Sequence, residues 1–367
     1  MSREGLVLAA LGLAAGVLFI VTSAVVERHH ASWEAMGKEW FARGEAALAA
    51  GRPEEAREAL RTALVYERDN ARYYFRLAQA LVAEGRTVEA RSYLRGLEER
   101  EPGNGPVQLE LARLSARAGD TAAAAGHYRA AIQALWEDEP DERRLQLRLE
   151  LARMLVEQGA PVEAQSELIA AAARLPAEDA ALQARVGELF RRAGDSSRAL
   201  DHFRAALRTR PDLAPALLGA GRTAYARGEW RRAVTYLRRA VRALPGDSFA
   251  AEMLETAEAA LAADPFLDRL TPAERSRRAA RAFQQSRARL EACRAESTAP
   301  DLETLAGRLE SRAPDATARA LQRNPDRLEP TMELVFAAQR AAAARCGAPE
   351  GADRALLLLA DSHEAES

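Results

Sequence analysis

The feature that most constrains the fold is a phrase that returns along the chain with the same landmarks. It occurs at residues 85–102, 194–211 and 228–245, and each copy runs from a glycine to a proline with an alanine five residues after the glycine. The glycine recurs at Gly51, Gly85, Gly119, Gly159, Gly194 and Gly228, and the alanine at Ala56, Ala90, Ala124, Ala164, Ala199 and Ala233. Both series keep spacings of 34, 34, 40, 35 and 34 residues. A shared period of this length predicts a fold made by stacking similar units.

Further landmarks indicate that each unit is a pair of helices. Seven residues before each glycine stands a small residue, which predicts a close helix–helix contact: Gly44, Ala78, Ala112, Ala152, Gly187 and Gly221. Four residues after each alanine stands a large apolar residue: Leu60, Leu94, Tyr128, Leu168, Phe203 and Leu237. Another apolar residue follows three positions later, and this i, i+4, i+7 stripe is typical of an amphipathic helix.

These landmarks resemble those of the tetratricopeptide repeat. The resemblance implies an all-α fold in which about six helix pairs form a right-handed α-solenoid over residues 31–247. The implied repeats cover about 37–70, 71–104, 105–138, 145–178, 180–213 and 214–247. It also implies a protein partner, bound as a peptide or helix in a concave groove lined by the first helix of each pair. The six extra residues between the third and fourth copies, 137–142, predict an acidic surface turn or a lengthened helix end.

The same register predicts which side chains face this groove. The ninth positions are Glu45, Gln79, Arg113, Arg153, Glu188 and Arg222, and the candidate partner-binding residues are Arg72, Arg76, Gln79, Arg113, Arg117, Arg153, Arg185, Arg192 and Arg222. Guanidinium groups can hold the carboxylates of an acidic segment. The alternative is that they pair along their own helices with Glu110, Glu150, Glu157 and Glu188. The fifth positions are apolar, from Phe41 to Leu218, which favours a ligand with apolar anchors over a clamp for a chain-terminal carboxylate.

The N-terminal stretch predicts a membrane anchor within residues 1–30. Residues 5–26 carry no charged side chain, and as a helix they would span roughly 33 Å. We therefore expect a single-pass membrane protein with a lipid-embedded segment and the bulk of the chain outside the cytoplasm, in the periplasm. A cleaved signal peptide is the alternative. Gly12 and Gly16 form a GxxxG pattern through which two copies could form a homodimer.

After the repeats the period stops. Residues 248–263 predict a capping helix, because Glu255 stands at the small-residue position and would block another tight pair. Residues 264–367 predict a small helical domain, whose first helix begins with the capping box Thr271 to Glu274 and carries a basic stripe. Cys293 and Cys346 fall on inward faces near helix ends, so a disulfide between them is predicted; two buried free thiols are the alternative.

The remaining features concern function. A formal net charge of -2 gives no reason to expect nucleic acid as a partner. The sequence contains no HExxH, GxSxG, CxxC or phosphate-loop pattern, so we expect no catalytic residues, metal or cofactor and no enzyme activity. The predicted function is a membrane-tethered scaffold in cell-envelope assembly or maintenance. The alternatives are a cytoplasm-facing, membrane-anchored assembly regulator, and an envelope enzyme with its activity in the C-terminal domain.

Overall fold

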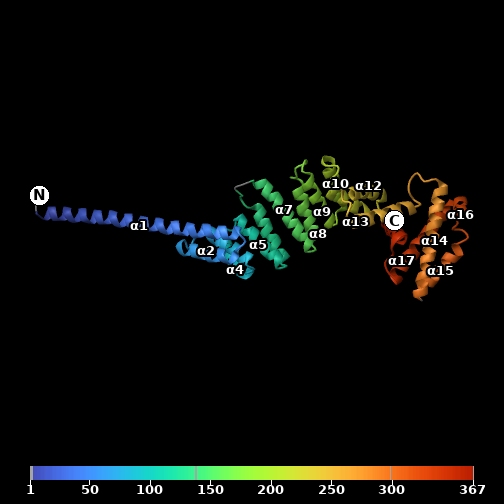
Figure 1. Ribbon diagram of the computed structural model, residues 1–367, viewed down its shortest axis with the longest axis horizontal. Coiled ribbons are helices and arrows are strands. Elements are labelled where there is room, and N and C mark those ends of the chain that lie inside the picture. Colours follow the sequence, from blue (N-terminus) through green and yellow to red (C-terminus); the bar gives the residue numbers. More distant parts are fainter. Residues whose placement is uncertain (1–2, 137–138, 298, 367) are drawn as a thin grey trace. The chain divides into compact units, whose positions relative to one another are not determined.

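The computed structural model describes residues 3–136, 139–297 and 299–366, and within these ranges every regular element is a helix (Figure 1). The predicted all-α fold class is therefore confirmed. The chain divides into two compact units, Met1–Gly159 and Ala160–Ser367. The first contains α1 Arg3–Ala49, α2 Pro53–Tyr66, α3 Ala71–Ala83, α4 Thr87–Arg100, α5 Gly105–Arg117, α6 Thr121–Gln133 and α7 Pro140–Glu157.

The second unit continues the pairing and adds the C-terminal helices. Its repeat helices are α8 Pro161–Ala172, α9 Ala180–Arg192, α10 Ser196–Thr209, α11 Ala214–Ala226 and α12 Trp230–Ala243. They are followed by α13 Ser248–Ala263, α14 Pro272–Glu296, α15 Pro300–Arg312, α16 Ala318–Arg323, the 3-10 turn η1 Pro325–Arg327, α17 Leu328–Cys346 and α18 Gly351–Glu366. The two helices of the fourth repeat, α7 and α8, thus belong to different units.

The recurring glycine makes the turn between the two helices of each pair. Gly85 has a φ of +85°, in the left-handed region that only glycine adopts without a steric penalty. The next residue, Arg86, donates its N–H to the carbonyl of Leu81 at 2.8 Å, which satisfies a carbonyl at the end of α3. The other five repeat glycines have positive φ angles as well. The recurring glycines therefore mark the turns at which the chain reverses direction.

The small residues predicted at the tight contact lie directly against the large apolar residue of the second helix. A Cβ atom added to Gly44 would lie 2.6 Å from Leu60, and one added to Gly221 would lie 2.7 Å from Leu237. The recurring alanines are all 0% exposed, and the large apolar positions are at most 2% exposed. The landmarks are thus the residues that set the distance between paired helices.

The predicted membrane span is corrected by the structure. Residues 5–26 are one part of α1, an unbroken 47-residue helix whose later part carries charged residues from Glu27 onward and packs on α2. Among the described residues, none of the helices combines the length and the apolar character that crossing a bilayer requires. The single-pass localisation and the lipid-embedded segment are therefore wrong, and the envelope role loses its basis. The surroundings of Gly12 are outside what the structure describes, and a Cβ added to Gly16 would meet no atom within 4 Å.

The acidic insert is described only in part. Glu137 and Asp138 lie outside the described residues. Glu139 has a φ of +42° and stands directly before α7, whose first residue is Pro140. The first residue of a helix does not need an N–H, because that group would have no partner within the helix, so proline suits this position. The end of the insert therefore starts the helix instead of forming a separate loop.

One apolar core continues from the last repeat into the C-terminal helices. Trp230 and Leu237 of α12, Phe283 of α14, Met332 of α17 and Leu356 of α18 are members of a single buried cluster. Cys293 at the end of α14 and Cys346 at the end of α17 are joined by a disulfide, with their Cα atoms 5.7 Å apart. The C-terminal helices are therefore built directly onto the end of the repeats.

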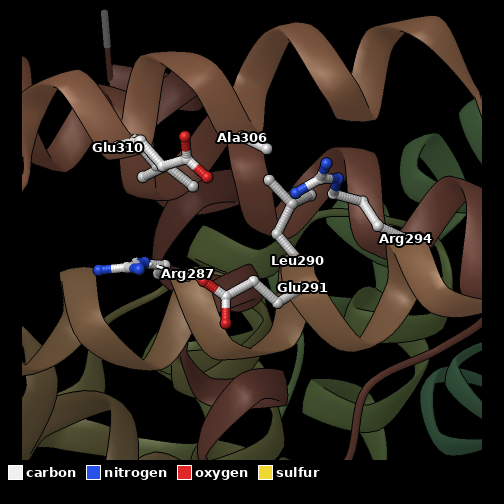
Figure 2. Close-up of a pocket in the computed structure, with 7 residues that line it drawn as sticks. Arg287, Leu290, Glu291, Arg294, Ala306 and Glu310 are labelled. Carbon is white, nitrogen blue, oxygen red and sulfur yellow. Dashed lines mark hydrogen bonds and ion pairs between the residues drawn. The ribbon is translucent and has the colours of Figure 1, made fainter.

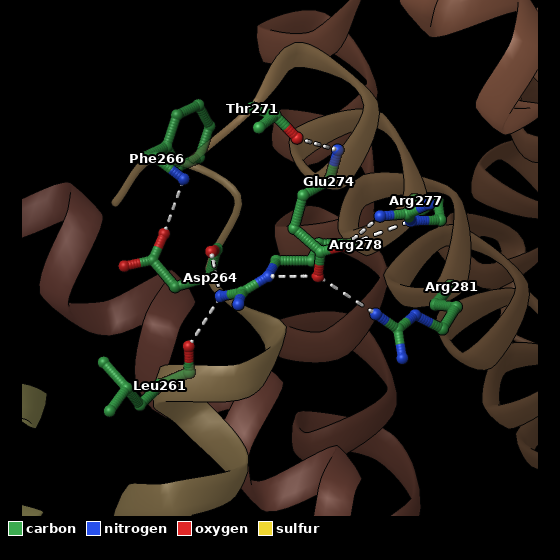
Figure 3. Close-up of polar contacts among 8 residues, drawn as sticks. All are labelled: Leu261, Asp264, Phe266, Thr271, Glu274, Arg277, Arg278 and Arg281. Atoms are coloured by element: carbon green, nitrogen blue, oxygen red, sulfur yellow. Dashed lines mark hydrogen bonds and ion pairs between the residues drawn. The ribbon is translucent and has the colours of Figure 1, made fainter. Parts of the chain in front are cut away.

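A polar corner holds α14 against α13 (Figure 3). Thr271 caps α14 by accepting the N–H of Glu274 at 3.2 Å. The Glu274 carboxylate then accepts from Arg278, whose other nitrogen donates to the carbonyls of Leu261 and Asp264 at 2.8 and 3.1 Å. These carbonyls belong to the end of α13, so one guanidinium satisfies the C-terminus of one helix and ties it to the start of the next.

Candidate functional site

The candidate site is the face formed by the first helices of the pairs, called here the first-helix surface. In the first unit, polar side chains on it form a ladder between neighbouring repeats. Arg76 of α3 donates to Glu45 of α1 at 3.0 Å and to Gln79 at 2.8 Å. Gln79 in turn donates to Glu110 of α5 at 3.4 Å. The ninth position of one repeat thus meets the sixth position of the next.

The strongest step of this ladder joins α5 to α7. Two nitrogens of Arg113 donate to the two carboxylate oxygens of Glu150 at 2.8 and 3.0 Å, and the hydroxyl of Tyr128 donates to the same carboxylate at 2.8 Å. Burial acts to raise the pKa of Glu150, but the hydrogen bonds from Arg113 and Tyr128 outweigh it and the pKa is lowered. The fork geometry makes this a charge-assisted pair.

Replacing Glu150 with glutamine should lower the free energy of unfolding of the first unit by about 1.5–3 kcal/mol at pH 7, the range for hydrogen bonds to charged groups. Because the folded pKa of Glu150 lies below its unfolded value of about 4.3, its contribution is complete above that pH and is lost as the pH falls through the folded pKa. Denaturant titrations at several pH values would measure this. A variant that retains the full acid dependence of the wild type would show that Glu150 does not supply it.

The ladder shows how the first-unit arginines are paired. Arg76 and Arg113 pair with carboxylates, as the alternative expected, but chiefly across neighbouring helices instead of along their own helix. Arg72 lies 3.6 Å from Glu45, with its guanidinium over the ring of Phe41. Arg117 and Arg153 are exposed and have no carboxylate within ion-pair distance among the described residues. Much of the predicted basic groove of this unit is therefore used to join repeats.

The first-helix surface of the second unit is different. Arg185 and Arg192 of α9 are exposed, stand two helical turns apart on one face, and form no ion pair with a described carboxylate. Arg222 of α11 lies with its guanidinium 5.5 Å from the ring of Phe249, which is 51% exposed. The carboxylate of Glu188 is already bound by Arg191 at 2.6 and 2.8 Å. Helices α9 and α11 are in contact, so this patch is basic and carries an aromatic ring at its edge.

The apolar fifth positions differ in how far they are exposed. Phe41, Leu149 and Ala184 are buried, whereas Phe75, Leu109 and Leu218 are half-buried. The half-buried residues leave apolar surface beside the polar ladder, where a bound segment could place an apolar side chain.

A repeated polar contact escaped the sequence reasoning. Gln108 donates to the carbonyl of Pro102 at 3.0 Å and accepts from His127 at 2.8 Å, so the His127 hydrogen is on Nδ1. Gln183 and His202 repeat this arrangement, with Gln183 donating to the carbonyl of Pro176 at 3.3 Å. In both copies the histidine follows the glutamine by 19 residues, and this shared spacing was the available signal. The contact joins the two helices of a pair to the loop before them and is structural.

Neither the basic stripe of α14 nor the hollow beside it offers a site for a small molecule. The basic stripe of α14 is largely paired: Glu274 binds Arg277 as well as Arg278, and Arg287 binds Glu291 at 2.9 Å. Figure 2 shows a hollow between α14 and α15, lined by Leu290, Arg294 and Glu310 among others, whose volume of about 10 Å³ suffices for no more than one water. Among the described residues, no three histidine, cysteine or carboxylate side chains come together to hold a metal ion.

Comparison with known proteins agrees with the helix-pair register. A family model described as "Tetratricopeptide repeat" matches residues 47–114 and 81–132, and a second with the same description matches residues 185–248. No curated protein sequence matches the chain.

Several solved structures are similar to part of the chain. YrrB, described as a TPR protein with an unusual peptide-binding site, is 21% identical over 53% of this chain and 97% of its own, with a TM-score of 0.43. PilF of Pseudomonas aeruginosa is 17% identical over 60% and 97%, with a TM-score of 0.44. PilW, described as a widely conserved type IV pilus biogenesis factor, is 16% identical over 60% and 97%, also with a TM-score of 0.44.

The family matches fall on the helix pairs whose turns, tight contacts and buried stripes are described above. Over residues 47–132 and 185–248 the chain therefore carries tetratricopeptide repeats.

Proposed function

We propose that the chain is a scaffold that binds an acidic segment of a partner protein on the first-helix surface of its second unit. Tetratricopeptide repeats are in general protein-interaction scaffolds. The observation that carries the more specific proposal is that two exposed arginines share one face of α9. Among the described residues, Arg185 and Arg192 pair with no carboxylate, whereas Arg76 and Arg113 of the first unit are bound by the chain's own carboxylates.

The composition of α9 and α11 supports an acidic ligand. Together they carry four arginines, Arg185, Arg191, Arg192 and Arg222, and one carboxylate, Glu188. A segment with carboxylates at helical or extended spacing could bind the unpaired guanidiniums, each through two parallel hydrogen bonds. The exposed ring of Phe249 and the half-buried Leu218 offer apolar contacts beside them. Such a ligand would combine charge with at least one apolar anchor.

Charge reversal at Arg185 and Arg192 should weaken binding of an acidic peptide at least tenfold, because each lost charge-assisted contact is worth about 1.5–3 kcal/mol. Fluorescence anisotropy with labelled acidic, neutral and basic peptides of equal length measures this. The wild type should prefer the acidic peptide, and the preference should fall with added salt.

The matched control reverses Arg208 and Arg242, two exposed arginines on the second helices α10 and α12. It changes the net charge by the same amount, so it should leave binding within about twofold if position matters more than total charge. Equal weakening by both double variants would contradict the proposed site.

A further inference from the structure

Helix α13 follows the repeats, and one of its residues is buried at a position where the first helices of the repeats are at least partly exposed. Counting from Ser248 in the repeat register, Glu252 is the fifth position of α13 and Thr256 the ninth. None of the six ninth-position side chains in the repeats is buried, whereas Thr256 is only 6% exposed. The contacts of α13 show that a later part of the chain lies against it.

That part is α18, the C-terminal helix. Its Arg354 forms an ion pair with Glu252. Near its other end, Ser362 packs on the turn after α11, where a Cβ added to Gly228 would lie 2.6 Å from the serine Cβ. His363 stacks on Phe266 with ring centroids 5.1 Å apart. In Figure 1 the C-terminus accordingly lies beside α13.

The packing of α18 resembles that of a helical ligand in a groove. Its buried residues form one stripe of small and leucine side chains: Ala355, Leu356, Leu359 and Ala360, each at most 5% exposed. This stripe packs between α13 and α17, and charged residues lie along its rim. An apolar stripe with a flanking ion pair is the pattern by which amphipathic helices bind to helical grooves.

The position of the disulfide makes α18 separable from the helices before it. The bridge between Cys293 and Cys346 fixes the end of α17 to α14, and α18 begins only after the segment from Gly347 to Gly351. Both of these glycines have positive φ, and Pro349 lies between them. The rim ion pairs, such as Arg340 to Glu364 at 3.0 Å, are largely exposed and contribute little to stability. Release of α18 would thus leave the bridge between α14 and α17 intact.

We propose that α18 is a latch on the first-helix surface, and that the face of α13 beneath it binds an amphipathic partner helix when the latch opens. The chemistry of that partner is given by α18 itself: an arginine opposite Glu252, and a stripe of alanine and leucine in the same buried cluster as Ala257. The inference extends the proposed function, since it uses the same kind of surface, but it concerns different helices. An acidic segment on α9 and α11 and a helix on α13 are separate ligands.

The test uses the full chain and a labelled peptide with the sequence of residues 350–366. Replacing Leu356 and Leu359 by alanine loosens the chain's own latch without changing α13. This variant should bind the peptide at least tenfold more tightly than the wild type. Adding Glu252→Arg should weaken that binding at least threefold, and a peptide carrying Arg354→Glu should restore it. A folded variant that binds the peptide no better than the wild type overturns the proposal.

Hydrogen exchange of the unaltered protein gives a test that does not depend on the variants. The amides of α18 should exchange at least tenfold faster than those of α17, because the latch opens while the bridged helices stay folded. Equal protection of both helices overturns the proposal. Reversal of the charges at Arg185 and Arg192 should leave the affinity for peptide 350–366 unchanged. The experiment can therefore refute the latch without refuting the acidic-segment site, and the reverse.

Discussion

Replacing Phe203 by alanine is expected to lower the free energy of unfolding of the second unit by about 3–5 kcal/mol, the range for removing a buried phenylalanine. Phe203 is 1% exposed, and its ring fills the space left by two glycines of first helices, Gly187 and Gly219. A Cβ added to Gly187 would lie 2.9 Å from the ring, which shows how closely α9 and α10 approach.

Denaturant unfolding followed by far-UV circular dichroism measures this effect. Phe249→Ala is the matched control, because it removes the same side chain from a site that is 51% exposed. The Phe249→Ala variant should lower the free energy of unfolding by less than about 1 kcal/mol, since half of the ring is already in water. Similar losses for the two variants would contradict the assignment of Phe203 to the contact that joins the repeats.

Removing the disulfide is expected to have the next largest effect. Cys293 and Cys346 are 53 residues apart. A cross-link that closes a loop of that length lowers the entropy of the unfolded chain and so raises the free energy of unfolding by about 4 kcal/mol. The double variant Cys293→Ala, Cys346→Ala should lose roughly that amount of stability. The loss should be concentrated in the helices after α13, which the bridge holds together.

Reductant provides the control for this prediction. The wild type should unfold at a lower denaturant concentration once both thiols are reduced, whereas the double variant should not respond. Mass spectrometry of the alkylated protein establishes the thiol state. A wild type that keeps its unfolding midpoint after full reduction would contradict a stabilising bridge.

The sequence was informative where a residue's role is local or repeated. The spacing from Gly51 to Gly228 identified the turns because each turn needs a left-handed glycine. The small residues from Gly44 to Gly221 identified the tight contacts because only a hydrogen or methyl group fits there. Helix α13 spans the residues 248–263 that were predicted as one helix.

Other features depend on contacts that no single repeat contains. The register placed Arg76 and Arg113 on the first helices, but their partners Glu45 and Glu150 are 31 and 37 residues away on neighbouring repeats. The covering of α13 by α18 depends on the path of about a hundred residues between them, which carry no period. The capping prediction took Glu255 to face solvent, and it does, but the adjacent Thr256 is covered.

The membrane prediction failed for a different reason. It rested on residues 5–26 being uncharged and long enough, as a helix, to cross a bilayer. The structure continues the same helix to Ala49, where it becomes the first helix of the first repeat and contacts α2.

The central claim is that an acidic segment binds the first-helix surface of the second unit. Photo-crosslinking tests it most directly: an acidic peptide carrying a photoreactive group is bound, irradiated, and its attachment points are mapped by mass spectrometry. We predict attachment on α9 and α11, near Arg185, Arg192 and Arg222, and its loss when Arg185 and Arg192 are reversed. Attachment confined to the second helices α10 and α12, or to the first unit, would contradict the claim.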